Sequence, residues 1–418
     1  MGNPPNIRFK GFTDDWEQRK VSDVAKIIAG GTPSTKENSY WEPKEIPWLS
    51  SGEVHKKYIT FTDDMISQIG MNNSSAKMVA KDSVLIALAG QGKTRGTVAI
   101  NRIPLTTNQS IAAMTFNENF IPEFVFYNLE NRYDELRRMS SGDGSRGGLN
   151  KQLVGDIEIP YTEKKEQERI GSFFESLDRI ITLHQRKCDE TKKLKKFMLQ
   201  KMFPKKDAKK PEIRFVGFTN DWEQRKLGEI VERVTRKNQD LVSELPLTIS
   251  AQYGLIDQNE FFDKRVASKD VSGYYLIYNG EFAYNKSTSS DAPWGAIKRL
   301  DRYENGVLST LYIVFRIKNE DILNSDFLMN YYDTNNWHKD IQAIAAEGAR
   351  NHGLLNIAPA DFFETELMLP QDIEEQKNIG NYFKSLNNLI TLHRRAYYNK
   401  KGGLTNVHND NQQYYAIL

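Results

Sequence analysis

The chain has 418 residues, enough for two or three ordinary domains, and its 39% hydrophobic and 27% charged residues are typical of a globular protein rather than a disordered one. It contains no run of about 18 apolar residues, its first residues lack the order of a secretory signal, and Cys188 is its single cysteine, so we expect a cytoplasmic protein that does not cross a membrane. Its 57 Lys and Arg residues nearly balance 55 Asp and Glu residues, so any binding of nucleic acid must come from local basic patches.

An internal repeat divides the chain into two halves. Residues 7–20, IRFKGFTDDWEQRK, return as residues 213–226, IRFVGFTNDWEQRK, with two differences. Residues 167–186, QERIGSFFESLDRIITLHQR, return as residues 376–395, QKNIGNYFKSLNNLITLHRR. The long segments between these blocks share little. We interpret the pattern as one scaffold or partner site used twice with two different ligands, the alternative being an old duplication whose loops drifted without consequence.

The repeated opening is followed in both halves by apolar residues with the i, i+3, i+4, i+7 spacing of one helical face. These residues are Val21, Val24, Ala25 and Ile28, and then Leu227, Ile230, Val231 and Val234. The spacing predicts a short amphipathic helix after Trp16 and after Trp222.

The divergent segments contain strand-like apolar runs punctuated by Gly, Pro, Asn and Asp. The clearest runs cover residues 83–89, 97–100, 274–278 and 310–317. Strands mixed with short helices predict compact domains of the α+β class.

The two closing blocks have the periodicity of a coiled coil, with steps of four and three residues. The first seam contains Ile170, Phe174, Leu177, Ile181 and His184 and continues to Met202, and the second contains Ile379, Phe383, Leu386, Ile390 and His393. From about Glu163 to Met202 the first helix would be about 60 Å long, so it needs a partner helix. We expect the two helices to pair with each other in antiparallel fashion, which would relate the halves by a pseudo-two-fold axis. At matching seam positions, His184 and His393 are predicted to set the register, with a pH-sensitive contact as a second interpretation.

The segment after the second closing block differs from the segment after the first. Beyond Arg395 the chain meets Gly402 and Gly403 and ends in LTNVHNDNQQYYAIL, which carries no heptad. The sequence therefore predicts a second helix of about 30 residues, roughly 45 Å long.

Several segments together resemble one protein family. They are the GFT.DWEQRK openings, GGTPSTKENSYWEPKEIPWLSSGEV at 30–54, TNQSI at 107–111, YNKSTSSDAPWGAIKRLDRYENGVLSTLYIVF at 284–315 and the Q..IG..F.SL...ITLH.R closings. These motifs, spread over nearly the whole chain, resemble the specificity subunit of type I restriction-modification systems.

The resemblance implies two target recognition domains joined by two long antiparallel coiled-coil helices, each domain reading one half of a split, asymmetric target. The parts would be a first recognition domain at 1–159, a first spacer helix at 160–205, a second recognition domain at 206–369, a second spacer helix at 370–401 and a divergent tail at 402–418. It further implies a chain without a catalytic centre that binds double-stranded DNA, two modification (methyltransferase) subunits and restriction subunits. S-adenosylmethionine, ATP and magnesium are expected on those partner subunits, with no cofactor in this chain.

Reading DNA in the major groove requires Arg or Lys for guanine and Asn or Gln for adenine, with further cations on phosphates. The candidate side chains lie on predicted loops, although an ordinary exposed charge is the default for any one of them. They are Lys93 and Arg95 in GQGKTRG (90–96), Arg146, Asn150 and Lys151 in SGDGSRGGLNK (141–151), Lys286, Ser287, Lys298 and Arg299 in the second half, and Arg350 and Asn351 in EGARNHGLLN (347–356).

Two other functional classes remain as alternatives. ALAGQGKT at 87–94 fits a relaxed phosphate-loop pattern with Lys93 on the phosphates, but the β-branched residues after it predict a strand and not the required helix. The third class is an assembly protein whose coil joins other proteins without DNA. The six histidines and one cysteine have no metal-ligand spacing, so no metal site is predicted.

Overall fold

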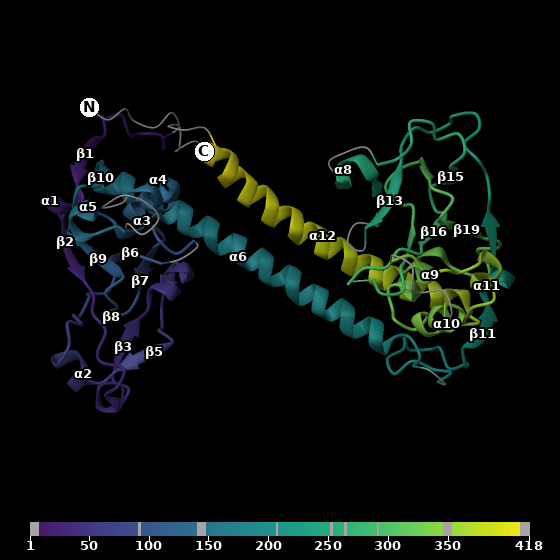
Figure 1. Ribbon diagram of the computed structural model, residues 1–418, viewed down its shortest axis with the longest axis horizontal. Helices are drawn as coiled ribbons and strands as arrows, with labels where there is room; N and C mark the ends of the chain where they lie inside the picture. The colour runs from purple at the N-terminus through teal and green to yellow at the C-terminus, as the bar shows by residue number, and fades with distance from the viewer. Residues whose placement is uncertain are drawn as a thin grey trace. The chain divides into compact units, whose positions relative to one another are not determined.

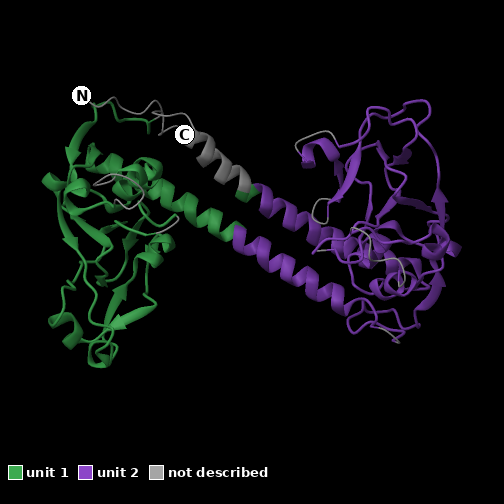
Figure 2. Cartoon of the chain, in the orientation of Figure 1, with its two compact units in different colours: residues 1–184, 396–418 green, residues 185–395 purple. Residues whose placement is uncertain are grey.

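The computed structural model divides the chain into two compact units (Figures 1 and 2). Unit 1 spans residues 1–184 and 396–418, and unit 2 spans residues 185–395. The structure describes residues 8–90, 93–139, 148–205, 208–250, 254–262, 266–290, 292–345 and 353–409.

Unit 1 is built around a five-stranded sheet with the order β2-β9-β6-β7-β4. A three-stranded sheet, β5-β3-β8, and a two-stranded ribbon, β1-β10, complete it. The strands are β1 (Glu17–Lys20), β2 (Ala25–Ala29), β3 (Ile46–Leu49), β4 (Tyr58–Ile59), β5 (Asp64–Ile66), β6 (Val84–Ala87), β7 (Val98–Asn101), β8 (Thr106–Thr107), β9 (Ile111–Phe116) and β10 (Glu158–Tyr161). The helices are α1 (Val21–Val24), α2 (Gln68–Asn72), α3 (Pro122–Asn131), α4 (Tyr133–Arg138) and α5 (Lys151–Gly155), with 3-10 turns η1 (Asn38–Tyr40) and η2 (Ser51–Lys56). Helix α6 (Lys164–Lys201) begins in unit 1, and its residues from 185 onward belong to unit 2.

Unit 2 is built around a four-stranded sheet with the order β12-β19-β16-β17. Three two-stranded ribbons, β13-β14, β15-β18 and β11-β20, accompany it. The strands are β11 (Glu223–Lys226), β12 (Val231–Val234), β13 (Leu247–Ser250), β14 (Gly254–Asp257), β15 (Tyr275–Tyr278), β16 (Phe282–Asn285), β17 (Ala296–Arg299), β18 (Asn305–Leu308), β19 (Ile313–Ile317) and β20 (Glu366–Leu369). The helices are α7 (Leu227–Ile230), α8 (Gln258–Phe262), α9 (Ser325–Tyr332), α10 (His338–Ile344) and α11 (Pro359–Phe363). Helix α12 (Ile373–Asn409) begins in unit 2, and its residues from 396 onward belong to unit 1.

Both units mix helices and sheets, as the α+β fold class predicted. The predicted apolar runs contain or overlap strands β6, β7, β15 and β19. Among the described residues, no helix is long and apolar enough to span a membrane.

The amphipathic helix predicted after each repeated opening is wrong. Only one helical turn forms, at α1 and at α7, and the chain then continues as strands β2 and β12. The physical reason is that Ile27 and Ile28 are β-branched and pair with Met114 and Ala113 of β9, so strand pairing overrides the helical spacing.

In unit 1 the repeated opening packs on the start of the repeated closing helix. The guanidinium of Arg8 donates two hydrogen bonds to the buried carboxylate of Glu166, at 2.5 and 2.8 Å, and Trp16 Nε1 donates a third at 3.1 Å. The next residue, Gln167, accepts a hydrogen bond from the backbone N–H of Ile121 at 3.0 Å. We call these contacts the anchor of unit 1.

Unit 2 has an equivalent anchor. Arg214 donates two hydrogen bonds to Glu375, at 2.6 and 2.7 Å, and Trp222 Nε1 donates a third at 3.3 Å. Gln376 accepts a hydrogen bond from the backbone N–H of Asn324 at 2.9 Å. In each unit, therefore, the repeated opening contacts the repeated closing block through equivalent residues.

The two closing helices are long and of nearly equal length. Helix α6 has 38 residues and α12 has 37. The prediction that the second helix ends near residue 401 is wrong, because α12 continues through Gly402 and Gly403 to Asn409. A glycine in a helix interior costs only about 1 kcal/mol, and no proline follows to stop the helix.

The predicted seam residues lie on the less exposed face of each helix. Within unit 2, Cys188 Sγ of α6 lies 3.8 Å from the carbonyl oxygen of Ile390 of α12, and the rings of Phe203 and Phe383 lie 6.2 Å apart. The final turns of α6 and the first turns of α12 thus run past each other in opposite directions in this unit. The buried members of the predicted seam are Ile170, Ile379, Phe383, Leu386 and Ile390, and the half-buried members are Phe174, Leu177, Ile181, His184 and His393.

Candidate nucleic-acid interface

Unit 1 brings two of the predicted DNA-contacting segments together. Strands β6 and β7 pair in antiparallel fashion, so the segment between them is a hairpin loop. The backbone N–H of Leu149 donates a hydrogen bond of 2.9 Å to the carbonyl oxygen of Leu88, at the base of that loop. The segment that carries Asn150 and Lys151 therefore begins beside the loop that carries Lys93.

Unit 2 repeats this arrangement. The backbone N–H of Leu355 donates a hydrogen bond of 3.0 Å to the carbonyl oxygen of Lys286, at the end of β16. Thr288 donates to the carbonyl oxygen of Gly353 through its N–H at 2.7 Å and its hydroxyl at 3.1 Å. Leu149 and Leu355 are both buried and lie 206 positions apart, the offset of the repeated openings (213 − 7 = 206).

We call these two junctions the loop pairs. The loop pair of unit 1 consists of the described residues 88–90, 93–97 and 148–151, and that of unit 2 consists of residues 285–290 and 353–356. Gly90 and Gly96 in the first loop pair have φ values of +144° and +84°, which favour glycine. A Cβ on Gly96 would lie only 3.0 Å from the backbone N of Arg137, so α4 packs directly against this loop.

The predicted residues of the first loop pair differ in how their side chains are placed. The side chain of Lys93 is exposed, while that of Arg95 is half-buried. The carbonyl oxygen of Lys93 accepts a hydrogen bond of 2.9 Å from the Tyr133 hydroxyl, which ties the loop to α4. Lys151 is exposed, and Asn150 caps α5 because its Oδ1 accepts a hydrogen bond of 2.9 Å from the N–H of Leu153.

The last turn of α4 adds two cations that were not among the predicted residues. Arg137 and Arg138 are exposed. Within the described part of the chain, no carboxylate forms an ion pair with either guanidinium, and Glu135 of the same helix pairs with Arg132 instead. In the sequence, these two arginines are visible as the basic pair in YDELRRM. They were missed because the predicted residues were all on predicted loops, whereas this pair lies at the end of a helix.

In the second loop pair, Lys286 and Ser287 follow β16. The ammonium of Lys286 donates to the carbonyl oxygen of Ile357 at 3.2 Å, and burial lowers the pKa of Lys286. Ser287 is exposed, and its N–H donates to Asn285 Oδ1 at 3.0 Å. Arg146, Arg350 and Asn351 lie outside the described residues.

The structure does not bring Lys298 and Arg299 to the second loop pair. Both lie at the end of β17 that is distant from residues 285–290, because Asn285 pairs with Ala296 and Phe282 with Arg299. Lys298 binds the Asp333 carboxylate at 2.5 Å. The Arg299 side chain, only 13% exposed, binds carboxylates of Asp301 and Asp326 at 2.6 Å each, so both cations are engaged within their own unit.

Two other kinds of site, a phosphate-binding loop and a metal centre, were compared with the described residues. Strand β7 follows the GQGKT segment, so the phosphate-binding helix N-terminus that a phosphate loop needs does not form there. Within the described ranges, no group of three or more His, Cys, Asp or Glu side chains is placed to hold a metal ion.

Comparisons with known proteins agree with this architecture. A family model described as the type I restriction modification DNA specificity domain matches residues 13–193 and 219–399. The type I restriction enzyme MjaIX specificity subunit of Methanocaldococcus jannaschii is 25% identical over 237 residues, which cover 52% of each chain. The type I restriction enzyme EcoR124I/EcoR124II specificity subunit of Escherichia coli is 26% identical over 179 residues, which cover 42% of this chain and 43% of that one.

The chain thus spans about half the length, or less, of these curated relatives. A solved structure, the S subunit of a type I restriction-modification system from M. genitalium, is similar over 99% of this chain and 98% of that one. Its TM-score is 0.61 at 14% sequence identity, which shows a shared fold.

Proposed function

Because the chain belongs to the type I restriction-modification specificity subunit family, we propose that its two units read the two halves of a split, asymmetric DNA target. Members of this family are non-catalytic DNA-recognition subunits, so recognition is the chemistry of the chain. The proposal places the protein in the cytoplasm, where it meets double-stranded DNA.

The single observation that carries the proposal is the pair of equivalent loop junctions. Leu149 binds Leu88 and Leu355 binds Lys286 through the same kind of backbone hydrogen bond. The junctions match, but the side chains that they display differ, with Lys93 and Arg95 in one and Ser287 in the other. Equivalent supports with different side chains are what reading two different half-sites requires.

Within each loop pair we assign roles by position. Lys93, Arg95 and Lys151 supply donors to base edges or phosphates of the first half-site, and Arg137 and Arg138 bind its phosphates. Lys286 and Ser287 serve the second half-site, together with the predicted residues Arg146, Arg350 and Asn351 in their respective halves. Lys298 and Arg299 are left to their carboxylate partners.

The long helices are proposed to pair over their whole lengths and to dock the partner subunits. Each helix carries a second apolar face at repeat-equivalent positions, Ile180 and Leu183 on α6 and Leu389 and Leu392 on α12. These four side chains are between 37% and 61% exposed. Two equivalent apolar sites fit two modification subunits, to which restriction subunits are added, and S-adenosylmethionine, ATP and magnesium belong to those partners.

The test is methylation mapping of genomic DNA from cells that express the full chain with its modification subunit, against cells that express the modification subunit alone. We expect a split adenine-methylated motif only when the chain is present. A complex that forms but yields no motif would contradict DNA recognition and favour the assembly-protein alternative.

A further inference from the structure

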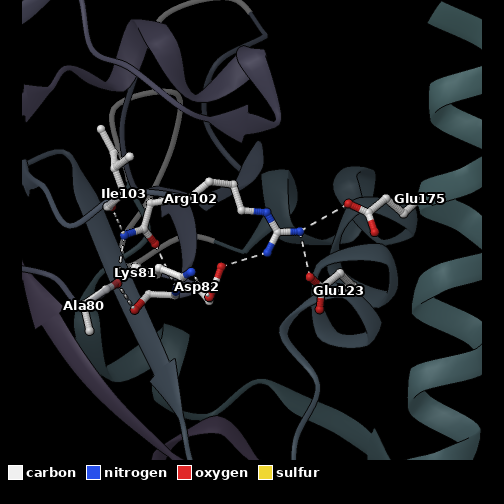
Figure 3. A network of polar contacts seen from close by, with 9 residues as sticks. Ala80, Lys81, Asp82, Arg102, Ile103, Glu123 and Glu175 are labelled. Atoms are coloured by element: carbon white, nitrogen blue, oxygen red, sulfur yellow. Dashed lines mark hydrogen bonds and ion pairs between the residues drawn. The ribbon is translucent and has the colours of Figure 1, made fainter.

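A polar network joins the first recognition domain to helix α6 (Figure 3). Arg102, which follows β7, directs its guanidinium toward α3 and α6. It binds Asp82 Oδ1 at 2.9 Å, Glu123 Oε1 of α3 at 2.7 Å and Glu175 Oε1 of α6 at 3.5 Å. One guanidinium therefore bridges the sheet, α3 and the long helix.

A second set of contacts lies one helical turn further along α6, at Asp178. Tyr127 of α3 donates its hydroxyl to Asp178 Oδ2 at 3.1 Å, and the Tyr58 hydroxyl lies 2.5 Å from that of Tyr127. Lys57 Nζ lies 2.5 Å from Glu130 Oε1 and 3.6 Å from Asp178 Oδ2. Burial raises the pKa of Tyr58 and of Tyr127, so both phenols keep the protons that they donate.

We call Lys57, Arg102 and Tyr127 of the domain, with Glu175 and Asp178 of α6, the latch. The backbone around it is strained. Three non-glycine residues in the described part of the chain have positive φ, and two of them, Lys57 and Asp82, belong to the latch or bind it directly. Such conformations persist only where the surrounding structure enforces them, and they concentrate at functional positions.

The surrounding backbone holds both strained residues. The carbonyl oxygen of Lys57 accepts a hydrogen bond of 2.7 Å from the N–H of Ile100, and the N–H of Asp82 donates one of 2.7 Å to the carbonyl oxygen of Asn101. Both partners belong to β7, the strand that leads into Arg102. Strand β7 therefore holds the backbone of both strained residues and leads directly into Arg102.

The latch is repeated only in part. In unit 2, Arg299 binds Asp326 of α9 at 2.6 Å, as Arg102 binds Glu123 of α3 in unit 1, but the two acids of α6 have no counterparts. The closing blocks share their Glu, Gln and Gly positions, but Glu175 and Asp178 are replaced at the equivalent positions by Lys384 and Asn387. In unit 2, Lys384 Nζ lies 3.6 Å from Asp326 Oδ2. The helix thus contributes an acid to the domain contact in unit 1 and a base in unit 2, so each contact is matched to its own domain.

Two contacts at separate points on α6 fix the angle between the domain and the helix, whereas a single contact would let the domain rotate about that point. Glu166 of the anchor and Asp178 of the latch are twelve residues apart on α6, a separation of about 18 Å along the helix axis. In a domain about 30 Å across, a tilt of roughly 7° moves the far edge by about 3.5 Å, the length of one base-pair step. Small changes at the latch therefore have consequences on the scale of one base pair.

We propose that the latch fixes the direction in which the first recognition domain projects from α6, and that it thereby helps to set the gap between the two half-sites. Its members are positioning residues and do not touch DNA. The inference rests on the proposed function, because a gap exists only if the two units read two half-sites.

The experiment uses the full chain with its modification subunit and reads half-sites and gap lengths separately from the methylated genome. The variants are Asp178→Ala, Tyr127→Phe, their combination, and Glu175→Lys, which places a cation opposite Arg102. Glu168→Lys is the matched control, because it reverses a charge on the same helix at an exposed position without a partner in the described ranges. Asp178→Glu tests rescue by a residue that keeps the acceptor.

We expect every latch variant to keep both half-sites and to raise methylation at sites whose gap differs by one base pair by about fivefold relative to the normal gap. The Asp178→Ala and Tyr127→Phe combination should match Asp178→Ala alone, because Asp178→Ala already removes the hydrogen bond that Tyr127→Phe removes. Glu168→Lys should leave the gap unchanged. Asp178→Glu should also keep the normal gap, because Glu retains a carboxylate acceptor.

Three results would overturn the proposal. An unchanged gap in latch variants that melt at lower temperature would make the latch a stabilising contact only. An altered first half-site would make its members part of the reading surface. A wild-type chain that produces no split motif would refute the proposed function itself, and the latch proposal with it.

Discussion

Asp333 receives two ammonium groups from different elements of unit 2. Lys298 of β17 lies 2.5 Å from its Oδ1, and Lys195 of α6 lies 2.8 Å from its Oδ2. Burial alone would raise the pKa of Asp333, but the two ammonium groups outweigh burial and hold that pKa below its usual value. A carboxylate with a lowered folded-state pKa stabilises the protein above its unfolded pKa of about 3.9, and this contribution is lost as the pH falls through the folded-state pKa.

We therefore expect Asp333→Asn to lower the free energy of unfolding of unit 2 by about 3 kcal/mol at pH 7, because Lys195 and Lys298 lose their shared anion. The difference between wild type and variant should shrink below about pH 4, because the unfolded wild-type chain binds a proton at Asp333 before the folded state, whose Asp333 pKa is lower, does so. Urea unfolding at pH 7 and at pH 3 measures both values. A difference that is equal at the two pH values would contradict this role of Asp333.

Gly171 lets α6 approach α3 closely. A Cβ at this position would lie 2.9 Å from the Cβ of Glu123 and 3.2 Å from the backbone N of Phe124. Alanine adds about 1 kcal/mol of helix propensity, but forcing a methyl group into this contact costs about 1–3 kcal/mol.

We expect Gly171→Ala to lower the melting temperature of unit 1, although the same change stabilises most helices. Thermal unfolding measures it, with Ser172→Ala on the exposed side of the same helix as the control. A higher melting temperature for Gly171→Ala would show that α3 can move away without loss. Gly380 in unit 2, whose Cβ would meet Asp326 at 2.8 Å, provides an independent repetition.

At the scale of elements, the sequence predicted the features that depend on local pattern. The seam positions follow from a period of 3.5 residues, and the described side chains at those positions are the less exposed ones. The predicted opening helix was wrong because the spacing of its apolar residues does not distinguish a full helix from a single helical turn followed by a strand. These residues are Val21, Val24, Ala25 and Ile28. Only the pairing of β2 with β9, a contact with a distant segment, decides between them.

The candidate site was predictable to a similar degree. The loops were identified by glycines and charges, but the hydrogen bond between Leu149 and Leu88 joins residues distant in sequence and leaves no local signal. For the same reason the sequence could not show that Asp333 and Asp326 engage Lys298 and Arg299. Nothing in the sequence around a basic residue identifies the distant acidic residue with which it pairs in the folded chain.

Asn150 connects the first loop pair to α5. Its Oδ1 caps the helix, and reading adenine would need both that oxygen and the amide nitrogen. We therefore expect Asn150→Ala to lower the free energy of unfolding by about 1 kcal/mol. Asn150→Ser, which keeps a capping oxygen, should preserve both stability and the methylated motif. A changed first half-site in Asn150→Ser would instead establish Asn150 as a base-reading residue.

Arg137 and Arg138 extend the first loop pair onto a helix end. If both arginines bind phosphates, the double alanine variant should lower the affinity for target and for non-target DNA by the same factor, because phosphate contacts carry no sequence information. The slope of log affinity against log salt should fall in magnitude by about 0.9 for each phosphate that is no longer bound. Binding isotherms of the complex over a series of salt concentrations measure the slope, with the exposed Lys77→Ala as the control. An unchanged slope would exclude the two arginines from the interface.

At the scale of the whole molecule, each unit combines a repeated anchor with a second domain contact whose residues on the long helix are not repeated. The anchor residues Arg8, Trp16 and Glu166 return as Arg214, Trp222 and Glu375, while Glu175 returns as Lys384. The duplication therefore preserves how each domain is attached to its long helix, and under the latch proposal the direction of attachment differs between the two units. The repeat itself could be predicted from the sequence, but the difference between the anchor and the second domain contact could be recognised only from the contacts in the structure.

The division predicts the outcome of a domain exchange. Replacing residues 21–157 by the corresponding segment of another family member keeps β1 and β10, which remain paired, and keeps the anchor contacts of Arg8 and Trp16 with Glu166. The first half-site should become that of the donor and the second should stay unchanged, as methylation mapping would show. A donor without cations or a tyrosine hydroxyl opposite Glu175 and Asp178 should in addition relax the gap. A change in both half-sites would contradict two independent readers, because the anchor of unit 2 and its loop pair are untouched by the exchange.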